Sequence, residues 1–227
     1  MPRARSSKTY RQTAATPQEQ GSGCLSGFVL PPLAVVLFSA VFAFFVLMQP
    51  LTSSFELPPI TSKNISPVFR IEILYWADSI SKWAAASQLD PNLVATVMQI
   101  ESCGDPRAKS SAGAMGLFQV MPFHFYATDD PYNPNINALR GLTYLARSFE
   151  TSAGNPGLAL AGYNGGIGLI ARAEWTWPAQ TKRYVLYGLP IYEDARNGLE
   201  SSNALTEWYQ KYGVSLCQQA HRRLGLP

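Results

Sequence analysis

Histidines, cysteines and charged residues are all scarce in this sequence of 227 residues. Its two histidines and three cysteines do not occur at the short paired spacings of a zinc site, so we expect no bound metal. Charged residues make up 15% of the chain, and the net charge of +3 arises entirely within residues 1–24. The rest of the chain is neutral and offers no broad basic face to a phosphate backbone, which disfavours nucleic-acid binding.

Internal repeats and alternating strand patterns are also missing or rare. No repeat with a period of roughly 20–50 residues is visible, which excludes a solenoid. Hydrophobic residues, in contrast, make up 47% of the chain. That content suits one folded domain of ordinary size and excludes a disordered or fibrous protein.

The N-terminal third has the features of a membrane anchor. Residues 1–24 form a basic tail, and residues 25–51 contain no charged side chain and are almost wholly apolar from Leu33 to Gln49. This run approaches the roughly 20 residues that cross a bilayer. The basic tail predicts a cytoplasmic N-terminus, with everything after the span on the outer side. A cleaved signal peptide, cut near Thr52, and a buried core helix are the alternatives.

A linker and a folded domain follow the predicted span. Residues 52–67 are rich in proline, serine and threonine, which indicates an extended tether. The remaining stretch, residues 68–227, has about 160 residues, a normal length for a single domain.

The first part of this domain has helical periodicity. One apolar stripe predicts a helix over residues 68–87. Asp90 is a good N-cap and Pro91 a favourable first residue for a second helix, which Gly104-Asp105-Pro106 would stop. We therefore expect a mainly α domain. The stripe consists of Phe69, Ile73, Trp76, Ile80 and Trp83.

Further helices are expected toward the C-terminus. Apolar residues from Ala138 to Phe149 mark a third helix, and a fourth begins after Asn155-Pro156-Gly157 and ends at Gly165-Gly166. The tail from Asn203 to Leu226 predicts one or two helices that close the domain. Its apolar residues, expected to pack in the core, are Leu205, Trp208, Tyr212, Leu216 and Leu224.

Glu101 occupies an unusual position for a glutamate. It comes after a mostly apolar stretch, at the last turn of its helix, where the macrodipole disfavours a carboxylate. Apolar surroundings and the helix C-terminus both raise a carboxyl pKa, as a general acid near neutral pH requires. Glu101 is therefore a candidate catalytic acid, and the alternative is an ordinary glutamate that turns into solvent.

Three sequence blocks occur in the order and spacing of a known family. They are E-S at 101–102, S-x-x-G-A-x-G-L-x-Q-x-M-P at 110–122 and ALAGYNGG at 159–166. This succession closely resembles the soluble lytic transglycosylase catalytic domain, a lysozyme-like fold that cleaves bacterial peptidoglycan. The resemblance extends from about Trp76 to Val185.

The resemblance implies a role for each of five residues. Glu101 would be the sole catalytic acid and base, and Tyr163 would lie against it, with a hydroxyl that can orient the protonated carboxyl. Ser110 and Gln119 would offer hydrogen bonds to the N-acetyl and hydroxyl groups of the sugars. Met121 would supply a deformable apolar wall of the sugar cleft.

Each supporting residue also has an ordinary alternative. Gln119 could be a surface amide and Ser110 a turn or cap residue. Met121 and Tyr163 could pack in the core. Asn164 is a further candidate for substrate binding, although Asn-Gly is equally a helix stop.

The chain departs from the family pattern at one wall of the expected cleft. Gln-Thr at 180–181 stands where the family usually has Glu-Thr, so any ionic contact of that glutamate is lost. The segment 166–180 is also short. We expect Tyr184 to be a core residue, whereas Trp175 and Trp177 could stack on sugars or pack in the core.

Other functions stay open at this point. A lysozyme-type hydrolase needs a second carboxyl group, for which Asp105, Asp129 and Asp130 are possible. A non-catalytic wall-binding module is another alternative, against which the retention of Glu101 argues. A penicillin-binding acyltransferase, suggested by three short motifs, would have a small hydroxyl residue where Tyr212 stands.

The sequence thus predicts a membrane-anchored, lysozyme-like peptidoglycan lytic transglycosylase. Such an enzyme cleaves the β-1,4 bond between N-acetylmuramic acid (MurNAc) and N-acetylglucosamine (GlcNAc) and forms 1,6-anhydromuramyl ends. We expect it in the bacterial inner or cytoplasmic membrane, as a single-pass protein with its catalytic domain outside. Its expected partners are glycan strands and the membrane, with no cofactor, no metal and no nucleic acid.

Two cysteines, Cys103 and Cys217, lie on the predicted outer side, where a disulfide can persist. We hypothesise that they pair and tie the C-terminal tail to the helix that carries Glu101. Two buried free thiols are the alternative.

Overall fold

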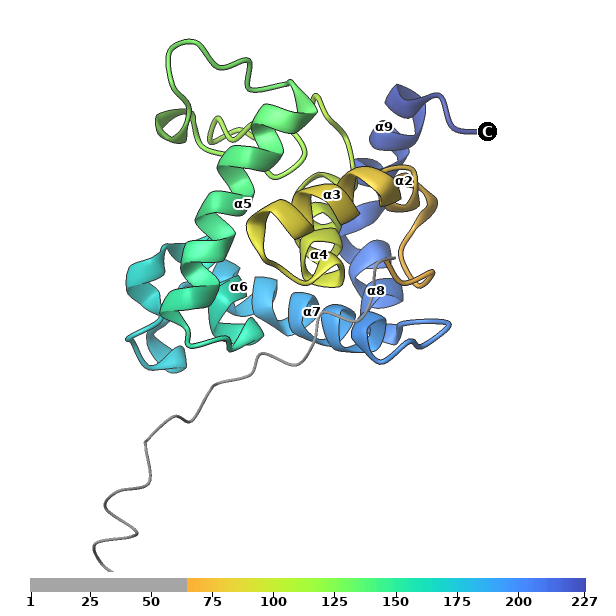
Figure 1. Cartoon of the computed structure of the whole chain (residues 1–227). Coiled ribbons are helices and arrows are strands. Elements are labelled where there is room, and N and C mark those ends of the chain that lie inside the picture. The colour runs from red at the N-terminus through yellow and green to blue at the C-terminus, as the bar shows by residue number, and fades with distance from the viewer. Residues whose placement is uncertain (1–64) are drawn as a thin grey trace, which may run out of the picture. The chain divides into compact units, whose positions relative to one another are not determined.

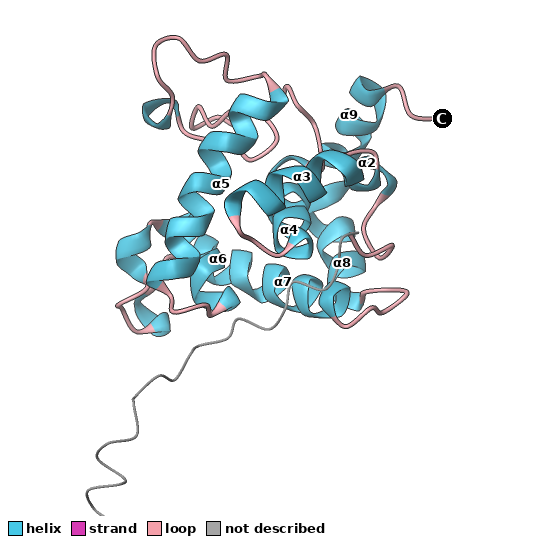
Figure 2. Cartoon of the chain, viewed as in Figure 1, coloured by secondary structure: helices cyan, strands magenta, loops and turns pink. Residues whose placement is uncertain are grey.

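A computed structural model describes residues 65–227 of the chain. These residues form α-helices joined by loops and short helical turns, and the described part contains no strand (Figures 1 and 2). The mainly α class is therefore as predicted. The predicted tail and span at 1–51, and most of the linker at 52–67, lie outside the described residues. Within residues 65–227, no helix combines the length and apolar character needed to cross a bilayer.

The central helix is α4 (Pro91–Ser102), which lies in the middle of the domain (Figure 1). It begins as predicted, because the Asp90 side chain accepts a hydrogen bond from the backbone N–H of Asn92. Nearly all of its residues are buried. Its neighbours are α2 (Ile71–Leu74), α3 (Ala77–Ser87), α7 (Ala179–Arg196) and α9 (Val214–Leu224).

The single helix predicted over residues 68–87 is in fact two, α2 and α3. The backbone leaves helical geometry at Trp76, with φ −95° and ψ 9°. The indole Nε1 of Trp76 donates to the carbonyl oxygen of Gly104 at 2.9 Å, a contact with a residue far along the chain. The predicted stripe is nevertheless correct, since Ile73 and Ile80 are fully buried.

Two further helices agree with the sequence, and a third, α7, was not predicted. The predicted third and fourth helices are α5 (Pro134–Thr151) and α6 (Pro156–Gly165), capped by Asn133 and Asn155. No helix was expected over α7, whose interior contains Pro190. Gly188 in α7 lets this helix approach closely, because a Cβ there would lie 3.2 Å from side-chain carbons of both α4 and α6.

The tail consists of α8 (Asn203–Trp208), a π-helical turn over Tyr209–Gly213 and α9. The hypothesised disulfide between Cys103 and Cys217 is present and ties α9 to the end of α4. Leu205 and Trp208 are buried as expected, but the expectation for Tyr212 was wrong, because this side chain is 48% exposed.

Candidate functional site

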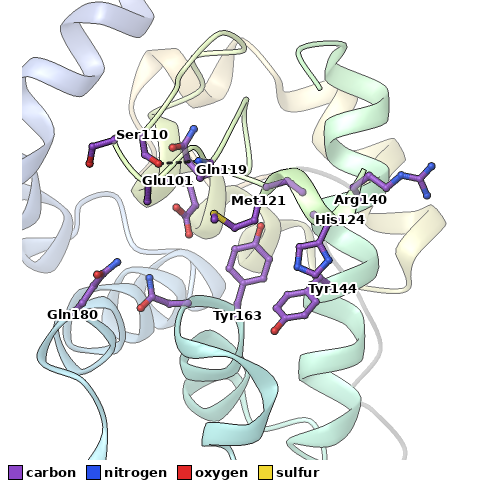
Figure 3. Close-up of a pocket in the computed structure, with 15 residues that line it drawn as sticks. Glu101, Ser110, Gln119, Met121, His124, Arg140, Tyr144, Tyr163 and Gln180 are labelled. Atoms are coloured by element: carbon purple, nitrogen blue, oxygen red, sulfur yellow. Dashed lines mark hydrogen bonds between the residues drawn. The ribbon is translucent and has the colours of Figure 1, made fainter. Parts of the chain in front are cut away.

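A cleft of about 360 Å³ lies at the C-terminal end of α4. Its walls come from α4, the loop over residues 110–121, α5, α6 and the start of α7 (Figure 3). All six predicted site residues line this one cleft, namely Glu101, Ser110, Gln119, Met121, Tyr163 and Asn164. Ser110 and Gln119 lie on one side of the Glu101 carboxyl, and Tyr163 and Gln180 on the other (Figure 3).

Glu101 is the penultimate residue of α4, and the next three residues hold it in place. The hydroxyl of Ser102 donates to the carbonyl oxygen of Leu117 at 2.6 Å and accepts from the backbone N–H of Gly104 at 3.1 Å. Cys103, between them, adopts a left-handed backbone with φ 50°, which ends the helix. The Glu-Ser pair thus fixes the end of α4 against the loop that forms the cleft wall.

The Glu101 side chain is half-buried in the cleft wall, and no cation is paired with its carboxyl group. Loss of solvation raises its pKa from 4.5 to about 8, and only the neighbouring Tyr184 hydroxyl works in the opposite direction. Among the residues that line the cleft in the described part of the chain, Glu101 is the one acidic side chain. A carboxyl that keeps its proton at neutral pH can act as a general acid.

Tyr184 was expected in the core, and the structure places its ring there but its hydroxyl at the cleft, next to Glu101. Its side chain is 6% exposed and packs in the main core. Its hydroxyl, however, lies beside Glu101 and has no hydrogen bond of normal geometry. We therefore regard the contact with Glu101 as weak, and we add Tyr184 to the site residues that the sequence did not identify.

Tyr163 lies against Glu101 but donates elsewhere. Its hydroxyl donates to the carbonyl oxygen of Phe118 at 2.7 Å. Burial, followed by the nearby Glu101, raises the pKa of Tyr163 well above its ordinary value, so the hydroxyl stays neutral. A donating hydroxyl retains a lone pair, so Tyr163 can accept a hydrogen bond from the protonated carboxyl.

Gln119 is more constrained than the sequence indicated. Its Nε2 donates to the carbonyl oxygens of Gly116 at 3.0 Å and Ala108 at 3.3 Å. Its backbone has φ 46°, an uncommon value for a non-glycine residue, which the loop must stabilise. Both amide protons are thus used within the loop, and the side-chain oxygen is the group left for a ligand.

The other three predicted residues, Ser110, Met121 and Asn164, also line the cleft, and two of them bond within the fold as well. The Ser110 hydroxyl accepts from the backbone N–H of Ala114 at 3.0 Å, which is the turn role, and its own proton remains available toward the cleft. Met121 is partly exposed along the cleft wall. The Asn164 oxygen accepts from the Thr181 hydroxyl at 3.0 Å, so its amide nitrogen is left to donate.

The structure adds cleft residues that the sequence analysis did not select. The rings of His124 and Tyr144 are in contact, with centroids 4.9 Å apart and planes tilted by 49°. Burial lowers the pKa of His124, which favours the neutral imidazole. Arg140 also lines the cleft, as does Gln180, which the sequence analysis had already placed at the cleft wall. Tyr144 belongs to the family resemblance, which gave it no role, and no motif marked His124 or Arg140.

Asn137 of α5 fixes the cleft loop from behind. Its Nδ2 donates to the carbonyl oxygens of Met115 at 2.8 Å and Pro131 at 2.9 Å, and its Oδ1 accepts from the backbone N–H of Phe118 at 2.9 Å. All three hydrogen bonds of this buried amide go to backbone groups and hold the loop in place. A Cβ at Gly116 would lie 2.3 Å from the Asn137 amide, so the loop can pass here only as glycine.

The candidates for a second carboxyl group are engaged elsewhere. Asp129 accepts from both Nε and Nη2 of Arg140, at 2.7 and 3.1 Å, and this pairing lowers its pKa. Asp105 is paired with Arg223. Neither these two nor Asp130 is among the residues that line the cleft. Within the described residues, no cluster of three or more histidine, cysteine or acidic side chains could hold a metal.

The two tryptophans in segment 166–180, Trp175 and Trp177, have different environments. Trp177 is buried, and its indole nitrogen donates to the carbonyl oxygens of Leu169 and Arg172, both at 3.2 Å. Trp175 is 80% exposed. Trp177 is therefore a core residue, and only Trp175 is free to contact a sugar.

Comparisons with known proteins agree with the site. Residues 78–185 match the model of the family described as Transglycosylase SLT domain. The transglycosylase of Enterobacteria phage PRD1 is 37% identical over 113 residues, which cover 49% of this chain and 40% of the phage protein. A solved structure of an inactive mutant of the lytic transglycosylase Slt from Pseudomonas aeruginosa is 24% identical, with a TM-score of 0.44, over 53% of this chain and 24% of that one. Residues 78–185 therefore form a transglycosylase SLT domain.

Proposed function

We propose that this protein is a lytic transglycosylase that cleaves the β-1,4 bond between MurNAc and GlcNAc of peptidoglycan and leaves 1,6-anhydromuramyl ends. One observation carries the proposal. Glu101 is the single acidic residue along the described cleft, and burial raises its pKa to about 8. The membership of residues 78–185 in the transglycosylase family supports the same substrate.

In the first step, Glu101 acts as the acid. Its protonated carboxyl donates to the glycosidic oxygen, and the bond from that oxygen to the muramyl anomeric carbon breaks. The positive charge that develops on this carbon needs a partner, and the described cleft offers no second carboxylate. The 2-acetamido oxygen of the substrate therefore bonds to the anomeric carbon and takes up the charge.

In the second step, Glu101 acts as the base. The carboxylate removes the proton from the C6 hydroxyl of the same muramyl residue. The C6 oxygen then bonds to the anomeric carbon, the acetamido oxygen leaves, and the 1,6-anhydro ring closes. Glu101 is protonated again, and no water is consumed.

A lysozyme-type hydrolysis is the competing reaction. It needs a carboxylate that acts as nucleophile or activates water near the anomeric carbon. Asp129 is a weak candidate, because its carboxylate already accepts two hydrogen bonds from Arg140 and one from the backbone of Tyr126.

Product analysis separates the two reactions. Purified sacculi are digested by the full chain in water enriched in ¹⁸O, and the fragments are analysed by mass spectrometry. The proposal predicts anhydromuramyl ends without ¹⁸O. Reducing muramic acid ends that contain ¹⁸O would mean hydrolysis. No product at all from the wild-type chain would favour a non-catalytic wall-binding module.

We also propose that residues 25–51 anchor the protein in the bacterial cytoplasmic membrane with its catalytic domain outside. The support is the uncharged apolar run after a basic tail. A reporter protein fused at residue 10 should lie in the cytoplasm, and one fused at residue 220 should lie outside the membrane. Recovery of a soluble form without residues 1–54 would replace the anchor with a cleaved signal.

A further inference from the structure

A second cavity, of about 210 Å³, continues from the cleft on the side of α7 and α8. Three residues, Glu101, Asn164 and Gln180, line both cavities, so the two are continuous at the catalytic glutamate. We call this second cavity the aromatic arm. It is otherwise lined by Ile100, Arg183, Tyr184, Tyr187, Trp208 and Tyr212.

Most of the outer wall of the aromatic arm lies beyond the family match. Tyr187, Trp208 and Tyr212 all come after residue 185, where the match ends. The ring of Tyr212 is 48% exposed and contacts the ring of Tyr187 edge to face, at 5.7 Å between centroids. An exposed, supported aromatic ring beside a sugar cleft can stack on the apolar face of a saccharide.

The aromatic arm also presents an uncompensated positive charge. The guanidinium of Arg183 lies over the Tyr212 ring, 5.5 Å from its centroid, and has no carboxylate partner in the described part of the chain. The neighbouring cation, Lys211, is paired with Glu207. Arg183 is thus free to bind an anion, and a guanidinium matches the two oxygens of a carboxylate.

A buried hydroxyl at the inner end of the arm, that of Tyr184, has only its weak contact with Glu101. The Tyr184 hydroxyl is buried, lines the arm and makes no hydrogen bond of normal geometry. A buried hydroxyl without a partner costs free energy unless a ligand or water supplies one. The arm therefore combines a stacking surface, a free cation and a hydroxyl with spare hydrogen-bonding capacity.

We propose that the aromatic arm binds a peptide-bearing muramyl unit of the strand, with the sugar against Tyr212 and a carboxylate of the stem peptide on Arg183. This inference rests on the proposed function. A strand cleaved at Glu101 must continue beyond it, and the arm begins at Glu101. Arg183 would then set a preference for strands whose peptides carry free carboxylates.

The test compares two substrates that differ only in charge. Strands with free stem-peptide carboxylates and the same strands after amidation are cleaved by the full chain. Arg183→Gln should raise KM about tenfold on the carboxylate strands and leave KM on the amidated strands unchanged, since one charged hydrogen bond is lost. Arg147→Gln, at an exposed arginine of α5, is the matched control and should change neither value.

A second pair of variants tests the stacking surface. Tyr212→Ala should raise KM several-fold on both substrates, and Tyr212→Phe, which keeps the ring, should not. Equal KM values for wild type and Arg183→Gln on both substrates would overturn the charge contact. An unchanged KM in Tyr212→Ala would overturn the stacking contact. Failure of the proposed function looks different, because the wild-type chain would then yield no anhydromuramyl ends from either substrate.

Discussion

Two carboxyl groups lie four residues apart around the end of α4, Asp105 fully buried and Glu101 half-buried, and their surroundings differ. Asp105 has no exposed side-chain surface and accepts from Arg223 at 2.9 and 2.8 Å, from Gln219 at 2.7 Å and from the backbone N–H of Arg107 at 2.9 Å. Glu101 has no cation, and its pKa rises to about 8. The donors around Asp105 let its carboxyl group hold the fold together, whereas loss of solvation without such donors keeps a proton on Glu101 available for chemistry.

The contrast between paired carboxylates and an unpaired one also distinguishes the two sides of the domain. On the side of α9, Glu72 is paired with Arg70 and lies 3.2 Å from the ring nitrogen of His221, so it also joins the tail to the first helix. The disulfide lies on this side as well. The cleft side, in contrast, positions neutral groups around Glu101. Substitutions on the side of α9 should therefore mainly lower the free energy of unfolding, and substitutions on the cleft side should mainly lower activity.

The largest effect is expected from Glu101→Gln. The amide keeps the shape but cannot transfer a proton, so kcat/KM should fall about a thousandfold. The free energy of unfolding should not decrease, because no ion pair is lost. Activity assays and thermal unfolding of the full chain measure both, with Glu150→Gln on the exposed face of α5 as control. Full activity of Glu101→Gln would mean that the site is wrongly assigned.

Removal of the disulfide should mainly affect stability. Cys103 and Cys217 are separated by 114 residues. For a loop of that length, the chain-entropy model predicts a loss of about 5 kcal/mol in the paired variant Cys103→Ser with Cys217→Ser. Denaturant unfolding of this variant against the wild type gives the difference. A loss below about 1 kcal/mol would show that the disulfide contributes little.

Asp105→Ala should destabilise the fold by a smaller amount. It leaves Arg223 without its partner, but that side chain is 39% exposed and can turn to solvent. We expect a loss of about 2–3 kcal/mol, below the usual range for fully buried pairs. Asp78→Ala, at an exposed position of α3, is the control and should cost less than about 1 kcal/mol. Equal losses in the two variants would contradict a structural role for Asp105.

The smallest effect is expected from Tyr163→Phe. The variant loses the hydrogen bond to the Phe118 carbonyl, which should cost about 1 kcal/mol of stability. Turnover should fall several-fold, far less than in Glu101→Gln, because Tyr163 orients the carboxyl and does not transfer the proton. A loss as large as that of Glu101→Gln would give Tyr163 a direct part in proton transfer.

Local signals predicted some elements well. Asp90 and Pro91 marked the start of α4, and Asn155-Pro156 marked the start of α6. These residues act within one helical turn, so the sequence alone defines them. The spacing of the family motif likewise placed Ser110 and Tyr163 on one cleft.

Tertiary contacts explain what the sequence did not predict. The break between α2 and α3 depends on Trp76 reaching Gly104, and the periodicity carries no sign of it. The helix α7 contains Gly188 and Pro190, residues that disfavour a helix unless packing requires it. Tyr184 has the pattern of a core residue, and only the crossing of α7 over α4 brings its hydroxyl to Glu101.

The pH dependence of kcat/KM for the full chain tests the central claim most directly. The reaction needs Glu101 protonated in the free enzyme, and burial raises its pKa from 4.5 to about 8. Activity should therefore persist at neutral pH and fall about tenfold for each pH unit above 8. A decline centred near pH 4.5, the ordinary value for a glutamate, would contradict the account, because Glu101 would then be ionised at neutral pH and unable to act as the acid.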